Sequence, residues 1–235
     1  MTICTCVHML ACLLVCFLVC LLLRIPFPTS TGISEQHLGK PDLVKEACSV
    51  VWPLADEQDN RDVVREEGGI ELILMSMLAH LGDLQLQTEV MKCIKNLATN
   101  TKNKLHFQHL GCETMIVMSV YAHPGEPDLY KLAFAALNNV VVDTATRLVA
   151  AVDQRTIELI LNTMTEFRQE EELQASSLFL LKSLTYEQTT CARIDANNRL
   201  RERLLDNLRF AIDRFPGTPA SKTANKVMQR LVGTV

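Results

Sequence analysis

The chain has 235 residues, of which 48% are hydrophobic, 21% charged and 5% aromatic, and its formal net charge is −4. The charged fraction is that of an ordinary globular protein, which argues against wholesale disorder. The slightly acidic balance argues against a nucleic-acid binder, which would need a basic face. The low aromatic content, with only 9 glycines and 8 prolines, disfavours an all-β sandwich. We therefore predict an all-α protein.

Residues 1–24 form a hydrophobic segment, since from Ile3 to Leu23 only Thr5 and His8 are polar. A helix of about 21 residues is about 31 Å long, which is enough to cross a bilayer core. The segment is a membrane anchor, a signal peptide or a misassigned start. No Lys or Arg precedes the apolar run, which disfavours a signal peptide. We expect an N-terminal hydrophobic helix, with possible membrane association through residues 1–24.

The segment 25–41 is rich in Pro, Ser, Thr and Gly and is predicted to be a linker. The first charges after the hydrophobic segment, Arg24 and Lys40, would place the following body in the cytosol if residues 1–24 cross a membrane. The cysteines agree with that location. Five of the nine lie in the first 20 residues, and the other four lie in apolar helical patterns where a free thiol packs as a small hydrophobic group. We predict a reduced, cytoplasmic body.

A repeat of about 43 residues runs through this body. The sequence MSMLAH at 75–80 recurs as MSVYAH at 118–123, 43 residues later. The sequence IELIL at 70–74 recurs unchanged at 157–161, 87 residues later, which is close to two periods. Matches in phase across three units indicate a repeat protein in which neighbouring units share one core.

Each unit is predicted to hold a short helix, a glycine or polar break, an apolar helix and a longer third helix. Residues 42–55 are typical of the last helix of an incomplete first unit, and residues 198–215 and 220–232 indicate a divergent final unit or cap. The helices expected between them are 60–67, 103–110 and about 144–152 (first), 70–80, 114–123 and 156–167 (second), and 84–99, 128–142 and 173–185 (third).

Residues 60–98, NRDVVREEGGIELILMSMLAHLGDLQLQTEVMKCIKNLA, resemble an armadillo repeat. The resemblance extends more loosely over residues 42–235. HEAT repeats are the near neighbour, and the short first helix followed by glycine favours the armadillo type. The resemblance implies a right-handed α-solenoid of about three to four three-helix repeats, with a concave groove lined by the third helices.

In peptide-binding armadillo proteins, an asparagine near the end of the third helix bonds the backbone of the bound peptide. Asn96 and Asn139 match this position, and Ser183 occupies it in the next unit. A tryptophan often stands one turn earlier, where this chain has Lys92, Ala135 or Phe179. The asparagines either bind a partner or satisfy backbone groups inside the repeat domain. The partner-binding candidates are Lys92, Asn96, Tyr130, Lys131, Asn139 and Ser183.

Four lysines gather near the end of the predicted helix 84–99, and they form either a docking site for an acidic partner or a solvated helix face: Lys92, Lys95, Lys102 and Lys104. Nucleotide-binding, nucleophile-elbow and zinc-protease motifs do not occur in the sequence. We expect a non-enzymatic scaffold without a cofactor or metal, which binds a protein or peptide along the concave surface and binds no nucleic acid. The alternative is a membrane-tethered scaffold or adaptor in which residues 1–24 are decisive.

Overall fold

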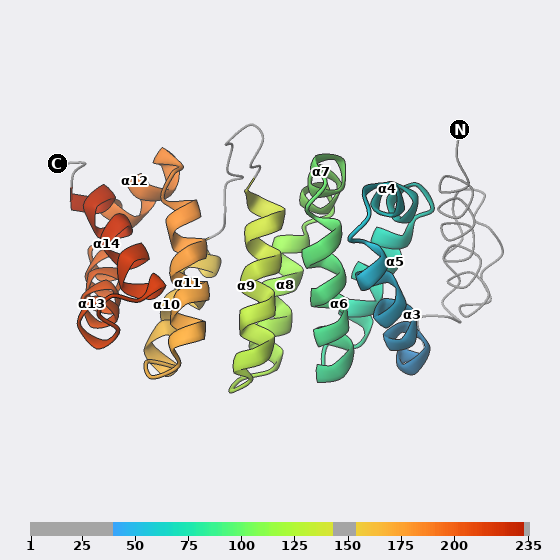
Figure 1. Cartoon of the computed structure of the whole chain (residues 1–235), viewed down its shortest axis with the longest axis horizontal. Coiled ribbons are helices and arrows are strands. Elements are labelled where there is room, and N and C mark those ends of the chain that lie inside the picture. The colour runs from blue at the N-terminus through green and yellow to red at the C-terminus, as the bar shows by residue number, and fades with distance from the viewer. Residues whose placement is uncertain (1–39, 143–153, 233–235) are drawn as a thin grey trace. The chain divides into compact units, whose positions relative to one another are not determined.

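A computed structural model describes residues 40–142 and 154–232 (Figure 1). Within these ranges every regular element is an α-helix, which confirms the all-α prediction. The expected N-terminal helix in residues 1–24, nearly all of the expected linker 25–41 and the expected short helix 144–152 lie outside the described residues. Among the helices that are described, none is both long and apolar enough to cross a bilayer.

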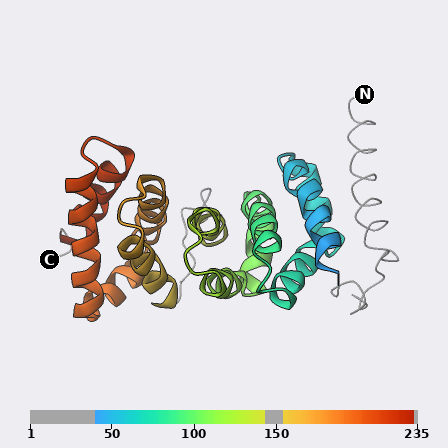
Figure 2. The same cartoon turned by 90° about the horizontal axis from the view of Figure 1, so that it is seen from below.

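The chain divides into two compact units, residues 1–124 and 125–235. The first contains α3 (Pro41–Leu54), α4 (Gln58–Glu66), α5 (Gly69–Ala79), α6 (Leu84–Leu97), α7 (Thr101–His109) and α8 (Cys112–Ala122). Equivalent helices pack on one another in this unit: α3 on α6, α4 on α7 and α5 on α8 (Figures 1 and 2). Long helices therefore meet long helices, and short helices meet short ones.

The boundaries of these helices follow from local sequence. Gly68 and Gly111, 43 residues apart, have φ of +74° and +71° and stand just before α5 and α8. Residues with a Cβ disfavour this left-handed conformation, so glycine allows the chain to turn sharply between the first and second helices. A Cβ on the neighbouring Gly69 would lie 2.8 Å from Val64 Cγ1 and 2.9 Å from Val64 O. The second glycine thus permits the close approach of α4 and α5.

The second unit contains α9 (Pro127–Val141), α10 (Gln154–Glu166), α11 (Glu171–Leu184), α12 (Gln188–Ala196), α13 (Asn198–Arg214) and α14 (Pro219–Val232). Here α11 packs on both α9 and α14, and α10 packs on α13. The sequence analysis did not anticipate α12, because only Thr190 and Ile194 are buried in it and its apolar pattern is weak. It has nine residues, as α4 and α7 do.

The same buried contact recurs in the two units. Gln87 on α6 donates from Nε2 to Met77 O at 2.9 Å and to His80 O at 2.8 Å, at the end of α5. Gln174 on α11, 87 residues later, donates to Met164 O at 2.8 Å and to Phe167 O at 3.0 Å, at the end of α10. Each glutamine satisfies carbonyls that a helix end leaves unpaired. The sequence period is therefore also a period of hydrogen bonding.

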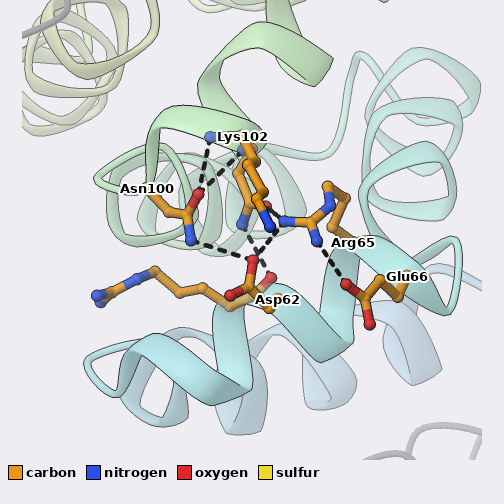
Figure 3. Close-up of polar contacts among 7 residues, drawn as sticks. Asp62, Arg65, Glu66, Asn100 and Lys102 are labelled. Carbon is orange, nitrogen blue, oxygen red and sulfur yellow. Dashed lines mark hydrogen bonds and ion pairs between the residues drawn. The ribbon is translucent and has the colours of Figure 1, made fainter.

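A polar network joins the short helices α4 and α7 (Figure 3). Arg65 donates to Asp62 Oδ1 at 2.5 Å and to Asn103 Oδ1 at 2.8 Å, and it also reaches Glu66. Asn100 caps α7 by accepting from the backbone N–H of Lys102 at 2.8 Å, and its own amide donates to Asp62. The Arg65 guanidinium is the main reason that the pKa of Asp62 is lowered. These groups satisfy one another, so the network holds α4 against α7.

Candidate interaction surface

The six predicted partner-binding residues divide between the two units. Lys92 and Asn96 lie on α6 of the first unit. Tyr130, Lys131 and Asn139 lie on α9 of the second unit, and Ser183 lies on its α11. We describe the residues of each unit by themselves.

Asn96 connects the ends of two long helices. Its Nδ2 donates to Trp52 O on α3 at 2.7 Å and to Asp56 Oδ1 at 3.1 Å. The Trp52 carbonyl needs this donor because the N–H of Asp56 turns instead to Pro53 O. Both amide hydrogens of Asn96 are therefore used within the first unit. Its Oδ1 remains the group with which a partner's N–H could bond.

Lys92 lies one turn before Asn96 on the same face of α6. Its Nζ is 2.7 Å from Glu89 Oε1 and 5.6 Å from the centre of the Trp52 ring. A cation over an aromatic face at this distance is held by the ring quadrupole. An aromatic ring therefore accompanies the asparagine, but it comes from the preceding long helix. We define the α3–α6 surface as Trp52, Asp56, Glu89, Lys92 and Asn96.

The sequence analysis missed Trp52 and Asp56. It searched for an aromatic residue four positions before each asparagine on the same helix, where α6 carries Lys92. The packing of α3 on α6 supplies Trp52 from 44 residues away, as the hydrogen bond to its carbonyl shows. The available signal was that Trp52 is the one tryptophan of the chain and lies near the end of a long helix.

In the second unit, Lys131 lies between two carboxylates. Its Nζ is 2.7 Å from Asp128 on its own helix and 3.1 Å from Glu172 on α11. Hydrogen bonds to both carboxylates raise the pKa of Lys131, so it is a cation at neutral pH. Its side chain is 32% exposed, and both acids are open to solvent. A partner's acidic group would have to compete with Asp128 and Glu172 for this ammonium.

Two of the six candidates are buried. Tyr130 is only 4% exposed, and its ring meets Phe167 edge to face at 5.4 Å between centroids. Ser183 is 7% exposed and donates to Phe179 O at 3.1 Å. These two side chains pack inside the unit and present little surface to a partner. Asn139 is half-buried on α9, so Lys131 and Asn139 are the candidates of this unit that reach the surface.

A side chain again bonds the end of the preceding long helix at the C-terminal end of the second unit. Arg230 on α14 donates to Lys182 O on α11 at 2.7 Å, and its guanidinium lies 3.4 Å from the centre of the Tyr186 ring. Lys182 occupies the same place in α11 as Trp52 does in α3, the twelfth of 14 residues. Arg230 on α14 thus bonds a carbonyl near the end of α11, as Asn96 on α6 bonds a carbonyl near the end of α3.

The four-lysine cluster does not form one face. Lys92 and Lys95 are half-buried on α6, whereas Lys102 is exposed at the start of α7. Lys104 is only 4% exposed, so its ammonium is not offered to a docking partner. The predicted cluster is therefore reduced to Lys92 and Lys95 on the long helix.

No group of three or more His, Cys, Asp or Glu residues that could hold a metal ion occurs among the described residues. The His106 imidazole lies beside a carboxylate, with its Nε2 2.7 Å from Glu71 Oε1. The described geometry of the α3–α6 surface offers hydrogen bonding, charge and an aromatic face, which are means of recognition. Comparison of the sequence with protein-family models and with curated proteins finds no match.

Proposed function

We propose that the chain is an armadillo-type scaffold that binds a segment of another protein along its long third helices. Three observations support an α-solenoid of about three to four repeats. Equivalent helices pack on one another within each unit. The glutamine contact at the end of the second helix recurs 87 residues later. The bond to the carbonyl near the end of a third helix also occurs in both units.

The α3–α6 surface is the part of this proposed groove that we assign to binding. The partly exposed Trp52 indole comes from α3, and it meets Lys92 and Asn96, which lie one turn apart on α6. An extended peptide could donate a backbone N–H to Asn96 Oδ1 and place an acidic side chain near Lys92. Lys131 and Asn139 are proposed as contacts of the second unit. The single observation that carries the proposal is the convergence of Trp52, Lys92 and Asn96.

A binding experiment on the full chain tests this function. Lys92, Asn96 and Asn139 are changed together to alanine, and proteins captured in cells are quantified against the native chain. A matched variant changes Gln58, Lys102 and Gln188 to alanine, which are exposed residues on the short helices α4, α7 and α12. We expect specific partners to be lost with the first variant and kept with the second. Equal capture by a folded triple variant would exclude the long-helix surface as the binding site.

Membrane tethering is the second candidate function, and the uncharged run from Ile3 to Leu23 supports it. In this proposal the cytoplasmic repeats hold their partner near a bilayer. Carbonate extraction of membranes tests it, because an anchored chain stays in the pellet and loses this behaviour when residues 1–24 are deleted. A full-length chain that is wholly extracted rejects the tether and leaves the binding proposal intact.

A further inference from the structure

Four large apolar side chains are exposed on the second helices of the first unit. Met75 and Leu78 on α5 are 41% and 38% exposed, and Met118 and Tyr121 on α8 are 44% and 52% exposed. Each pair is three residues apart, so its members lie on one face of their helix. The two pairs are also equivalent in the repeat, because they are 43 residues apart. We call these four residues the apolar stripe.

The helices that carry the stripe run side by side in the same direction. They pack on one another, and His123, just past the end of α8, has its Nε2 2.7 Å from Leu81 O, just past the end of α5. Equivalent positions on parallel neighbours face the same side. The four side chains consequently form one continuous surface across α5 and α8.

In the second unit, the equivalent positions on α10 carry polar residues. Asn162 and Thr165 on α10 stand 87 residues after Met75 and Leu78. Asn162 accepts from Arg203 on α13 at 2.6 Å, and Thr165 lies 3.3 Å from the amide nitrogen of Asn207. Polar pairs thus cover this face between α10 and α13. An apolar face at the same place in the first unit is not a requirement of the fold.

Charge defines what the stripe can accept. Residues 72–82 and 114–125 contain no Asp, Glu, Lys or Arg. The nearest carboxylate on the face is Glu71, one turn before Met75. Its Oε1 lies 2.7 Å from His106 Nε2, its Oε2 is buried without a hydrogen-bond partner, and the side chain as a whole is 33% exposed. The stripe is therefore neutral along its length and acidic at the end where α5 begins.

The size of the stripe suits one helix rather than a second copy of the chain. Large side chains each offer about 200 Å², so four of them at 38–52% exposure present on the order of 350 Å². A stable protein dimer needs about 800 Å² from each partner. The apolar face of one amphipathic helix docks through a few anchor side chains at positions such as i, i+4 and i+7, and a surface of this size can receive them. Met75 and Met118 can adapt to its shape because methionine is flexible and polarizable.

We propose that the apolar stripe binds the apolar face of an amphipathic helix of another protein, with a Lys or Arg of that helix placed against Glu71. This surface lies on the second helices and shares no residue with the α3–α6 surface. The two surfaces would let one scaffold hold two different segments at once.

Fluorescence anisotropy with a labelled peptide tests this proposal. The probe has about 15 residues, leucines at i, i+4 and i+7 and a lysine one turn before them. The full chain is held in lipid nanodiscs so that no free detergent competes, and empty nanodiscs provide the background. The test variant carries Leu78→Lys and Met118→Lys. The control carries Leu105→Lys and Phe179→Lys, which change apolar residues outside the stripe that are 59% and 49% exposed.

We expect saturable binding that weakens at least tenfold in the test variant and stays within twofold in the control. A probe with glutamate in place of its lysine should bind about threefold more weakly to the native chain, and this difference should vanish with Glu71→Gln. Absence of binding, or equal binding by the test variant, would overturn the proposal. So would dimerisation of the chain through the stripe, or binding that appears only after residues 1–24 are deleted, because another occupant would then cover it.

Discussion

Replacing Gln87 with alanine should destabilise the first unit by far more than a change at the helix surface. Gln87 is 0% exposed, and its amide is the donor for two carbonyls at the end of α5. Met77 O lies in a buried contact, so its loss of a donor costs about 1–3 kcal/mol. His80 O is partly open to water, which limits its loss to about 0.5–1 kcal/mol. The free energy of unfolding should fall by about 1.5–4 kcal/mol in total.

Urea unfolding of the full chain, followed by far-UV circular dichroism, measures this change. Gln174→Ala should cost a similar amount, because Gln174 makes the same pair of bonds in the second unit. Gln85→Ala is the control, since Gln85 is exposed on the same helix as Gln87. If Gln87→Ala and Gln85→Ala gave equal stabilities, the glutamine contact would not be a structural element of the repeat.

Three further predictions concern the helix ends and the thiols. Gly69→Ala should destabilise the chain by more than about 1 kcal/mol, because the new methyl would crowd the side chain and carbonyl of Val64. Gly82→Ala is the control: a methyl there would meet nothing within 4 Å, so the urea midpoint should change little. Asp83→Ala should cost about 1 kcal/mol at pH 7 by removing the cap on the Leu86 N–H. The hydrogen bond from that N–H is the main cause of the lowered pKa of Asp83. The capping contribution to stability is therefore fully present above the ordinary pKa of 3.8, and the stability difference between Asp83→Ala and the native chain should vanish as the pH falls through the folded-state pKa. A difference that persists at pH 2 would contradict this. Maleimide labelling with peptide mapping should modify half-buried Cys191 before Cys112, whose pKa burial raises further; simultaneous labelling of both thiols in the folded chain would show that Cys112 is not buried.

Much of the helical framework could be predicted from periodicity alone. The third helix expected at 84–99 is α6 (Leu84–Leu97), and the second helix expected at 70–80 is α5 (Gly69–Ala79). These segments carry regular apolar spacing and clear end signals, such as Asp83 before α6. The short α12 has neither a regular spacing of apolar residues nor a glycine at its end, so its sequence alone did not predict it.

The candidate surface was less predictable, because sequence spacing describes one helix at a time. Asn96 was identified from its position, but its donors are taken by groups on and beyond α3 that lie far away in sequence. Tyr130 was predicted to contact a partner. It is buried instead, because its ring packs on Phe167 of the following segment. Burial and cross-helix contacts depend on which helices meet, and the period alone does not give this.

Site-specific photocrosslinking tests the central claim most directly. A photoreactive amino acid is placed at Lys92 on the α3–α6 surface or at Lys102 on α7 in the full chain, and the captured partner segment is identified by mass spectrometry. We predict that one acidic segment crosslinks from position 92, that position 102 does not capture it, and that Asn96→Ala and Trp52→Ala each reduce its yield. Capture of the same segment from position 102 alone, or an undiminished yield in both variants, would contradict binding along the long helices.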